Sequence, residues 1–153
     1  MITTIKSKIK IEMISIDENG YHFMVQALAN GKSIRLLVDT GASRTVFDKT
    51  RLLSLFNKKE IKFKNVVHKS VGLGTKSMKS QTAVLSELKI GDCEIQNFQL
   101  VVLNLEHVNF SYQMIGDAGI DGVIGSDLLV DLKAVINIQK RELSLKQTVK
   151  KKE

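Results

Sequence analysis

The stretch Val38-Asp39-Thr40-Gly41-Ala42-Ser43 (VDTGAS) follows the apolar run Ile34-Arg35-Leu36-Leu37. The run predicts a buried strand, and the chain places an acid directly at its end. Burying a carboxylate costs free energy unless the group is paired or used. We therefore treat Asp39 as the candidate functional acid. The alternative is an aspartate that only caps the turn into the following helix.

The residues after Asp39 each suit a functional loop. Thr40 offers a small hydroxyl that can bond nearby backbone groups. Gly41 has no Cβ, so a second backbone segment can approach it closely. Ala42 leaves room for a ligand, and Ser43 can hydrogen-bond either the turn or a bound chain. A short D-T-G-A-S motif remains compatible with both function and capping when it stands alone.

Length and composition indicate one soluble globular domain. The 153 residues suffice for one hydrophobic core, and 43% hydrophobic with 25% charged residues is an ordinary balance. We expect one domain over 1–153, with its core at about 20–146 and lysine-rich terminal extensions. The single cysteine, Cys93, cannot form an internal disulfide. The lysine–isoleucine alternation of the N-terminus fits neither a signal peptide nor a membrane anchor, so we expect a cytoplasmic protein without membrane contact.

The formal net charge of +7 raises the possibility of a nucleic-acid partner. Much of the excess comes from lysines near the two ends: Lys6, Lys8, Lys10, Lys146, Lys150, Lys151 and Lys152. No aromatic residues alternate with these lysines, the chain has no Trp, and no nucleic-acid motif is present. We interpret the charge as favouring solubility and do not expect nucleic acid to be the partner. The opposite hypothesis predicts binding that weakens steeply with salt.

The pattern along the chain predicts a mostly β protein with one or two short helices. Predicted strands occupy 9–16, 21–29, 33–38, most of 66–105, the start of 121–132 and a final hairpin over 133–146. Turns are expected at 17–20, 30–32, 91–92 and about 139–141, where Gly, Asn, Asp or polar residues cluster.

Two short helices are predicted. A capping box, Thr45-x-x-Asp48, predicts the start of the first. Its predicted apolar face consists of Leu52, Leu53, Leu55 and Phe56. Ser126 is expected to cap the second helix, after the apolar pair and glycine of 123–125.

Other possible sites are weaker. The histidines His22, His68 and His107 are isolated and lack the spacing of metal ligands, so we expect no metal site. Cys93 falls in a predicted turn without an adjacent base. Neither GKS at 31–33 nor GLGTKS at 72–77 has the context of a phosphate-binding loop.

Three segments together resemble the single-domain, retroviral-type (retropepsin-like) aspartic proteases. They are the strand leading into Asp39-Thr40-Gly41-Ala42, the glycine-bearing VGLGTKSM about thirty residues later, and VIGSDLL at 123–129. The resemblance covers most of 20–146, and the order and spacing of the segments are more specific than any one of them. It implies a closed β-barrel with orthogonally packed sheet and one or two short helices.

The resemblance also implies roles for particular residues. Asp39 would be the catalytic acid within the loop Thr40, Gly41, Ala42 and Ser43. Gly72, Leu73 and Gly74 would form a flap over a bound polypeptide, although an ordinary surface hairpin explains these glycines as well. Val123, Ile124 and Gly125 would support the active-site loop. The chemistry of the family requires two carboxylates sharing one proton and no cofactor.

This chain contains one Asp-Thr-Gly, so the second carboxylate must come from elsewhere. Asp121 is followed by Gly-Val, which a simple turn explains. A symmetric homodimer that contributes two copies of Asp39 is the better solution, and the terminal strands are candidate dimer elements. The competing hypothesis is a catalytically silent, protease-like domain that binds peptides or serves in assembly. The segment between 74 and 121 is also longer than the family requires, and it could reshape the cleft.

Overall fold

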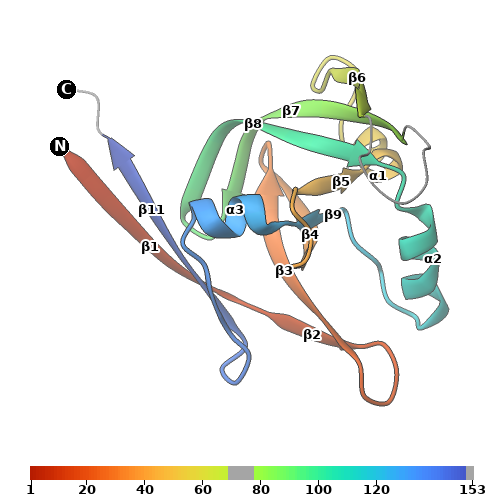
Figure 1. Ribbon diagram of the computed structural model, residues 1–153, viewed down its shortest axis with the longest axis horizontal. Helices are drawn as coiled ribbons and strands as arrows, with labels where there is room; N and C mark the ends of the chain where they lie inside the picture. Colours follow the sequence, from red (N-terminus) through yellow and green to blue (C-terminus); the bar gives the residue numbers. More distant parts are fainter. Residues whose placement is uncertain (69–77, 151–153) are drawn as a thin grey trace.

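The computed structural model describes residues 1–68 and 78–150. Strands dominate the described part: β1 (Ile2–Lys10), β2 (Glu12–Ser15), β3 (Tyr21–Ala29), β4 (Lys32–Val38), β5 (Val46–Asp48), β6 (Phe63–His68), β7 (Met78–Ile90), β8 (Cys93–Leu103), β9 (Gly122–Ile124), β10 (Val135–Asn137) and β11 (Glu142–Lys150). The helices of this part are α1 (Lys49–Leu55), α2 (Glu106–Met114) and α3 (Ser126–Asp131). The prediction of a mostly β protein is confirmed (Figure 1).

The larger sheet closes on itself. Its strand order is β2-β3-β4-β9-β5-β8-β7-β6, and an additional pairing joins β3 to β7. Leu28 pairs with Lys89 and Ala29 with Leu88 at this closure. Strands β3, β4, β9, β5, β8 and β7 therefore form a closed barrel, as expected. Closure removes free edges from these six strands.

The barrel encloses the main hydrophobic core. Side chains alternate along β4, so that Ile34, Leu36 and Val38 are buried inside while Arg35 and Leu37 lie on the other face. A smaller cluster of Met24, Tyr112 and Ile120 covers that outer face, with Leu37 and Val123 packed against it. The strand that ends at Asp39 is thus packed on both of its faces.

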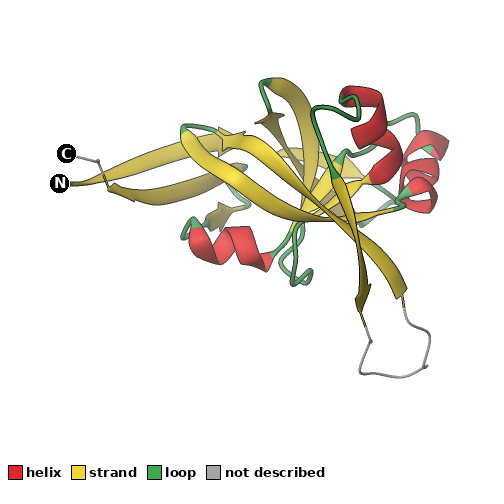
Figure 2. Cartoon of the chain, turned by 90° about the horizontal axis from the view of Figure 1, so that it is seen from above, coloured by secondary structure: helices red, strands yellow, loops and turns green. Residues whose placement is uncertain are grey.

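The remaining strands form a separate three-stranded sheet in the order β1-β11-β10. Strands β1 and β11 pair over nine residues, from Ile2 with Lys150 to Lys10 with Glu142. Figures 1 and 2 show the pair as an arm that projects from the barrel. The predicted bounds of the first strand, 9–16, are wrong: β1 begins at Ile2, and the buried Ile11 separates it from β2.

The predicted turns are confirmed. Asn30 and Gly31 have φ of 47° and 80° in the β3–β4 hairpin, which is the backbone that Asn-Gly favours. Strands β7 and β8 meet at Gly91-Asp92. The last hairpin turns at Ile138–Arg141, where the Arg141 N–H donates to Ile138 O.

The helix starts differ from the prediction. Asp48, not Thr45, is the N-cap of α1, and its side chain accepts a hydrogen bond from the Arg51 N–H. Leu52 and Phe56 are buried, whereas Leu53 is 47% exposed, so the apolar face is narrower than expected. Gly125, not Ser126, is the N-cap of α3, because Ser126 is already helical and uses its N–H elsewhere.

Helix α2 was not predicted from the sequence. Only Tyr112 is buried among its residues, while Phe110 and Met114 are more than 60% exposed. The helix therefore lacks the apolar stripe by which amphipathic helices are recognised. It lies on the outside of the barrel, beside the segment that leads into β9 (Figure 1).

Candidate active site

Asp39 follows the last residue of β4 and lies at the surface of the barrel. Its N–H donates to the Ile124 carbonyl over 3.0 Å, so the chain leaves β4 alongside β9. Asp39, Thr40 and Gly41 are exposed, in contrast with the buried Val38 just before them. The carboxylate therefore lies at the surface directly after the buried end of β4.

A tight turn orients the carboxylate. Asp39 Oδ1 accepts a hydrogen bond of 2.9 Å from the Gly41 N–H, and the Asp39 carbonyl accepts one of 3.2 Å from the Ala42 N–H. No hydrogen bond from the described residues reaches Oδ2 of Asp39. A Cβ at Gly41 would lie 3.3 Å from Asp39 Oδ1, and that oxygen is the sole described contact within 4 Å. Within this chain, Gly41 leaves space for the carboxylate rather than for a second backbone.

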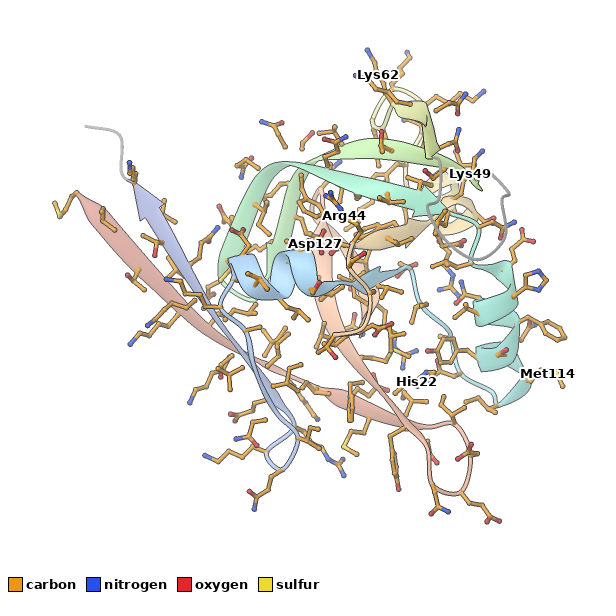
Figure 3. All side chains as sticks on the ribbon, in the orientation of Figure 1. His22, Arg44, Lys49, Lys62, Met114 and Asp127 are labelled. Atoms are coloured by element: carbon orange, nitrogen blue, oxygen red, sulfur yellow. The ribbon has the colours of Figure 1, made fainter. Side chains whose placement is uncertain are left out.

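The loop is fastened to the segment from β9 to α3. The Ser126 N–H donates to the Ala42 carbonyl over 2.7 Å. The Gly125 N–H donates to Thr45 Oγ1 over 3.1 Å, and Thr45 donates its hydroxyl and its N–H to the two Asp127 carboxylate oxygens over 2.7 and 3.0 Å. Figure 3 labels Asp127 and Arg44 close together where the loop meets α3.

Gly125 permits this close contact. A Cβ there would lie 2.5 Å from the Arg44 carbonyl carbon and 2.9 Å from the Ala42 oxygen, both of which belong to the backbone. Ile124 is buried in the main core and Val123 packs on the smaller cluster. The segment Val123–Gly125 thus lies directly against the loop.

Sequence reasoning missed Thr45 and Asp127 as parts of this arrangement. Thr45 was interpreted as a helix cap, but it is 1% exposed and binds Asp127 instead. A weak signal was available, because Asp127 is an acid in the first turn of a short helix.

Ser43 is exposed and makes no hydrogen bond within the described residues, so its side chain is free to meet another chain.

Asp121 lies far from Asp39. Strands β4 and β9 are parallel, with Leu36 opposite Gly122 and Val38 opposite Ile124. Asp121 is therefore level with Arg35, about four residues or roughly 13 Å below Asp39. Its carboxylate accepts the Arg35 N–H over 2.8 Å and lies 3.6 Å from Arg51. These contacts explain Asp121 as a structural residue, so it does not supply the second carboxylate.

A cleft of about 440 Å³ borders Asp39. Its lining residues are Tyr21, His22, Phe23, Leu37, Val38, Asp39, Thr40, Ile136 and Ile138. A larger cavity of about 550 Å³ lies between α1 and α2 and does not include Asp39. We assign the smaller cleft to the candidate site because it contains the exposed acid. The proposed flap residues Gly72, Leu73 and Gly74 lie outside the described residues; the paired strands β6 and β7 lead into that segment.

The described residues contain neither a metal-ligand cluster nor a membrane-spanning helix. In 1–68 and 78–150, no three His, Cys, Asp or Glu side chains cluster as metal ligands do. No helix within these same ranges has the length and apolar character needed to cross a membrane.

The comparisons with known proteins agree with the geometry. A family model described as aspartyl protease matches residues 25–128, and the chain belongs to this family. It is similar to the crystal structure of a retropepsin-like aspartic protease from Rickettsia conorii, with 24% identity, a TM-score of 0.57 and coverage of 97% of this chain and 96% of that chain. It is also similar to EIAV protease complexed with the inhibitor HBY-793, with 17% identity, a TM-score of 0.51 and coverage of 82% and 100%.

These two structures show that the fold is retropepsin-like, which confirms the fold expected from the sequence. A search of curated protein sequences gave no match.

Proposed function

We propose that this protein is an aspartic endopeptidase whose active site is completed by a second copy of the chain. The observation that carries the proposal is the exposed Asp39 on a loop that hydrogen bonds hold in place. These bonds lie within the turn itself and between the loop and the segment from β9 to α3. The other acid considered from the sequence is Asp121, whose carboxylate accepts the Arg35 backbone N–H and pairs with the Arg51 side chain. Membership in the aspartyl protease family supports the same conclusion.

The chemistry follows from two carboxylates held close together. Two acids about 3 Å apart cannot both ionise, so they share one proton. The ionised Asp39 takes a proton from a water held between the two, while the protonated Asp39 donates a hydrogen bond to the scissile carbonyl. Water attacks the peptide carbon directly and no acyl-enzyme forms. This chemistry needs no metal or cofactor.

The remaining predicted residues have supporting roles in the proposed dimer. Thr40 of each subunit would reach the loop of its partner across the two-fold axis. Gly72, Leu73 and Gly74 would close over the polypeptide substrate. The buried free thiol of Cys93 is compatible with a reducing compartment, so we place the enzyme in the cytoplasm.

The test compares wild type with Asp39→Asn on an unstructured protein substrate over about pH 4 to 8. Asp92→Asn, the same change at the exposed β7–β8 turn, is the matched control. We expect wild type and the control to cleave, pepstatin-like inhibitors to block them, and Asp39→Asn to be inactive. Equal cleavage by all three proteins would contradict the proposal. A folded wild type that binds but never cleaves would favour the peptide-binding module.

A further inference from the structure

His22 lies in the cleft beside Asp39, on the same face of the barrel wall. Strands β3 and β4 are antiparallel, with Met24 opposite Leu37. Continuing this register by two residues places His22 opposite Asp39, and residues two apart on a strand share a face. Both residues line the 440 Å³ cleft. The acid and the imidazole therefore line one and the same cleft.

The imidazole is held by a residue of α2. His22 Nδ1 lies 2.6 Å from the hydroxyl of Tyr112, and the two rings meet edge to face with centroids 5.6 Å apart. Tyr112 is 2% exposed and packs with Met24 and Ile120. The unpredicted helix α2 therefore contributes one buried side chain that fixes a cleft residue. Figure 3 labels His22 on the side of the barrel that faces α2.

This contact determines which ring nitrogen carries the hydrogen. A buried hydroxyl needs an acceptor for its proton, and within the described residues Nδ1 of His22 is the acceptor in reach. Burial, and next the charge of Asp117, raise the pKa of Tyr112 to about 12 against an opposing effect of Arg35, so the hydroxyl keeps its proton. Nδ1 therefore accepts, and the neutral ring carries its hydrogen on Nε2.

The Nε2–H group is then free to bind a ligand. No described residue accepts a hydrogen bond from it, and the walls around it are apolar, from Phe23, Leu37, Ile136 and Ile138. Asp39, Thr40 and Tyr21 are the other polar residues that line this cleft.

We propose that His22, positioned by Tyr112, is a specificity-determining residue that donates its Nε2–H to the carboxylate of a substrate glutamate near the scissile bond. This inference rests on the proposed peptidase function for its biological meaning. A glutamate suits the cleft because its methylene groups match the apolar walls and its carboxylate can accept the imidazole Nε2–H.

The first test reads the tautomer directly. Long-range ¹⁵N–¹H NMR correlations report which ring nitrogen of a histidine carries hydrogen, and the His22 signals are assigned through His22→Gln. We expect the hydrogen of the neutral His22 ring on Nε2. Tyr112→Phe removes only the hydroxyl and should abolish this bias, whereas Tyr21→Phe, which removes an exposed hydroxyl of the same cleft, should leave it. Hydrogen on Nδ1 of wild-type His22 would overturn the inference.

The second test measures binding without turnover, in an Asp39→Asn background. One fluorescent host peptide is prepared with Glu, Gln or Leu walked through each position, and dissociation constants are measured by anisotropy. At one position the Glu peptide should bind roughly tenfold tighter than the Leu peptide, as a hydrogen bond to a charged group allows. His22→Phe should remove that advantage while the Leu peptide binds as before.

Absence of a Glu preference, or its persistence in His22→Phe, would overturn the inference. Failure of the proposed function is a separate outcome. It would appear as wild-type protein that does not cleave any of these peptides although the Asp39→Asn protein binds them with the His22-dependent preference.

Discussion

Thr45 joins the active-site loop to the segment from β9 to α3 through one small side chain. Its hydroxyl donates to Asp127 and accepts the Gly125 N–H, while its own N–H donates to the second Asp127 oxygen. The side chain is almost completely buried. Loss of this hydroxyl would leave the buried Gly125 N–H without an acceptor and would remove one of the two hydrogen bonds to Asp127 Oδ1. Such orphaned groups cost more than the lost hydrogen bond itself.

Thr45→Val tests the role of this hydroxyl at nearly constant volume. We expect the free energy of unfolding to fall by about 1–3 kcal/mol, because buried partners are left unsatisfied. Urea unfolding followed by circular dichroism measures it. Ser43→Ala, an exposed hydroxyl of the same loop, should change stability by less than about 0.5 kcal/mol. Equal effects of the two substitutions would contradict the arrangement.

Two glycines of the site should respond differently to alanine. In Gly125→Ala the new Cβ meets the backbone of Arg44 at 2.5 Å, so the loop must move and the variant should be strongly destabilised. In Gly41→Ala the Cβ meets only Asp39 Oδ1 at 3.3 Å. That variant should remain folded but lose peptidase activity through a displaced carboxylate. Thermal unfolding and a peptide assay on both variants distinguish these effects, and a Gly125→Ala protein as stable as wild type would be the contrary result.

The sequence revealed the contiguous part of the site but not the part that the fold assembles. The contiguous part consists of Asp39, Thr40 and Gly41, which can be recognised as a motif because they are adjacent in the sequence. Thr45 and Asp127 are 82 residues apart, and their contact exists only because β9 lies beside β4. The local spacing predicts a capping box at Thr45. In the structure the Thr45 hydroxyl instead donates to the distant carboxylate of Asp127.

At the scale of elements, one ion pair ties the segment after α2 to the barrel. Arg35 on β4 donates to Asp117 over 2.6 and 3.1 Å and to the Gly119 carbonyl over 3.0 Å. Both side chains are largely buried. The hydrogen bond from Arg35 holds the pKa of the Asp117 carboxyl below its ordinary value near 3.8, against the opposing effect of burial.

This lowered pKa makes the contribution of Asp117 to stability dependent on pH. A carboxyl whose pKa is depressed in the folded state stabilises fully above its ordinary pKa, and the contribution is lost as the pH falls through the folded value. At pH 7, the free energy of unfolding of Asp117→Asn should be lower than that of wild type by on the order of 1–3 kcal/mol. The difference from wild type should shrink as the pH is lowered below about 3.8.

Urea unfolding at pH 7 and at a pH below about 3.8 measures the difference in stability between wild type and Asp117→Asn. Asp92→Asn is the exposed control. A difference that grows at low pH would have the wrong sign.

The arm places like charges opposite each other. Lys6 pairs directly with Lys146 on the exposed face of β1 and β11. Like charges in this position are destabilising, so Lys6→Glu should raise stability by roughly 0.2–1 kcal/mol. The gain should shrink in about 1 M NaCl, where the screening length is about 3 Å. Urea melts at low and high salt measure both effects, and Lys62→Glu, the same charge change outside any strand pairing, should show no comparable gain.

The hairpins were predictable because their turns are encoded locally. Asn30 and Gly31 supply two consecutive positive φ angles, which few other residue pairs adopt easily. Helix α2 has no comparable signal, since Val108, Phe110 and Met114 are exposed and only Tyr112 is buried. Its formation depends on contacts with the barrel, such as the Asn109 side chain bonded to both backbone groups of Ile120.

At the scale of the whole molecule, a closed barrel presents one exposed acid of the kind that the aspartyl protease family uses. The barrel was expected from the order of strands and turns, but its closure through β3 and β7 could not be deduced from local patterns. The arm was expected to serve in dimerisation. Its strands pair with each other within one chain, and the outer edge of β1 has no partner among the described residues.

Mixing wild type with Asp39→Asn counts how many Asp39 carboxylates one active site requires. The two proteins are allowed to exchange subunits at a fixed total concentration above that needed for dimers, and peptidase activity is measured against the fraction of wild type. If each site needs an Asp39 from both subunits, activity falls with the square of the wild-type fraction. A fall in direct proportion to that fraction would mean that each subunit acts separately with its own Asp39, and it would contradict a proton shared between two copies.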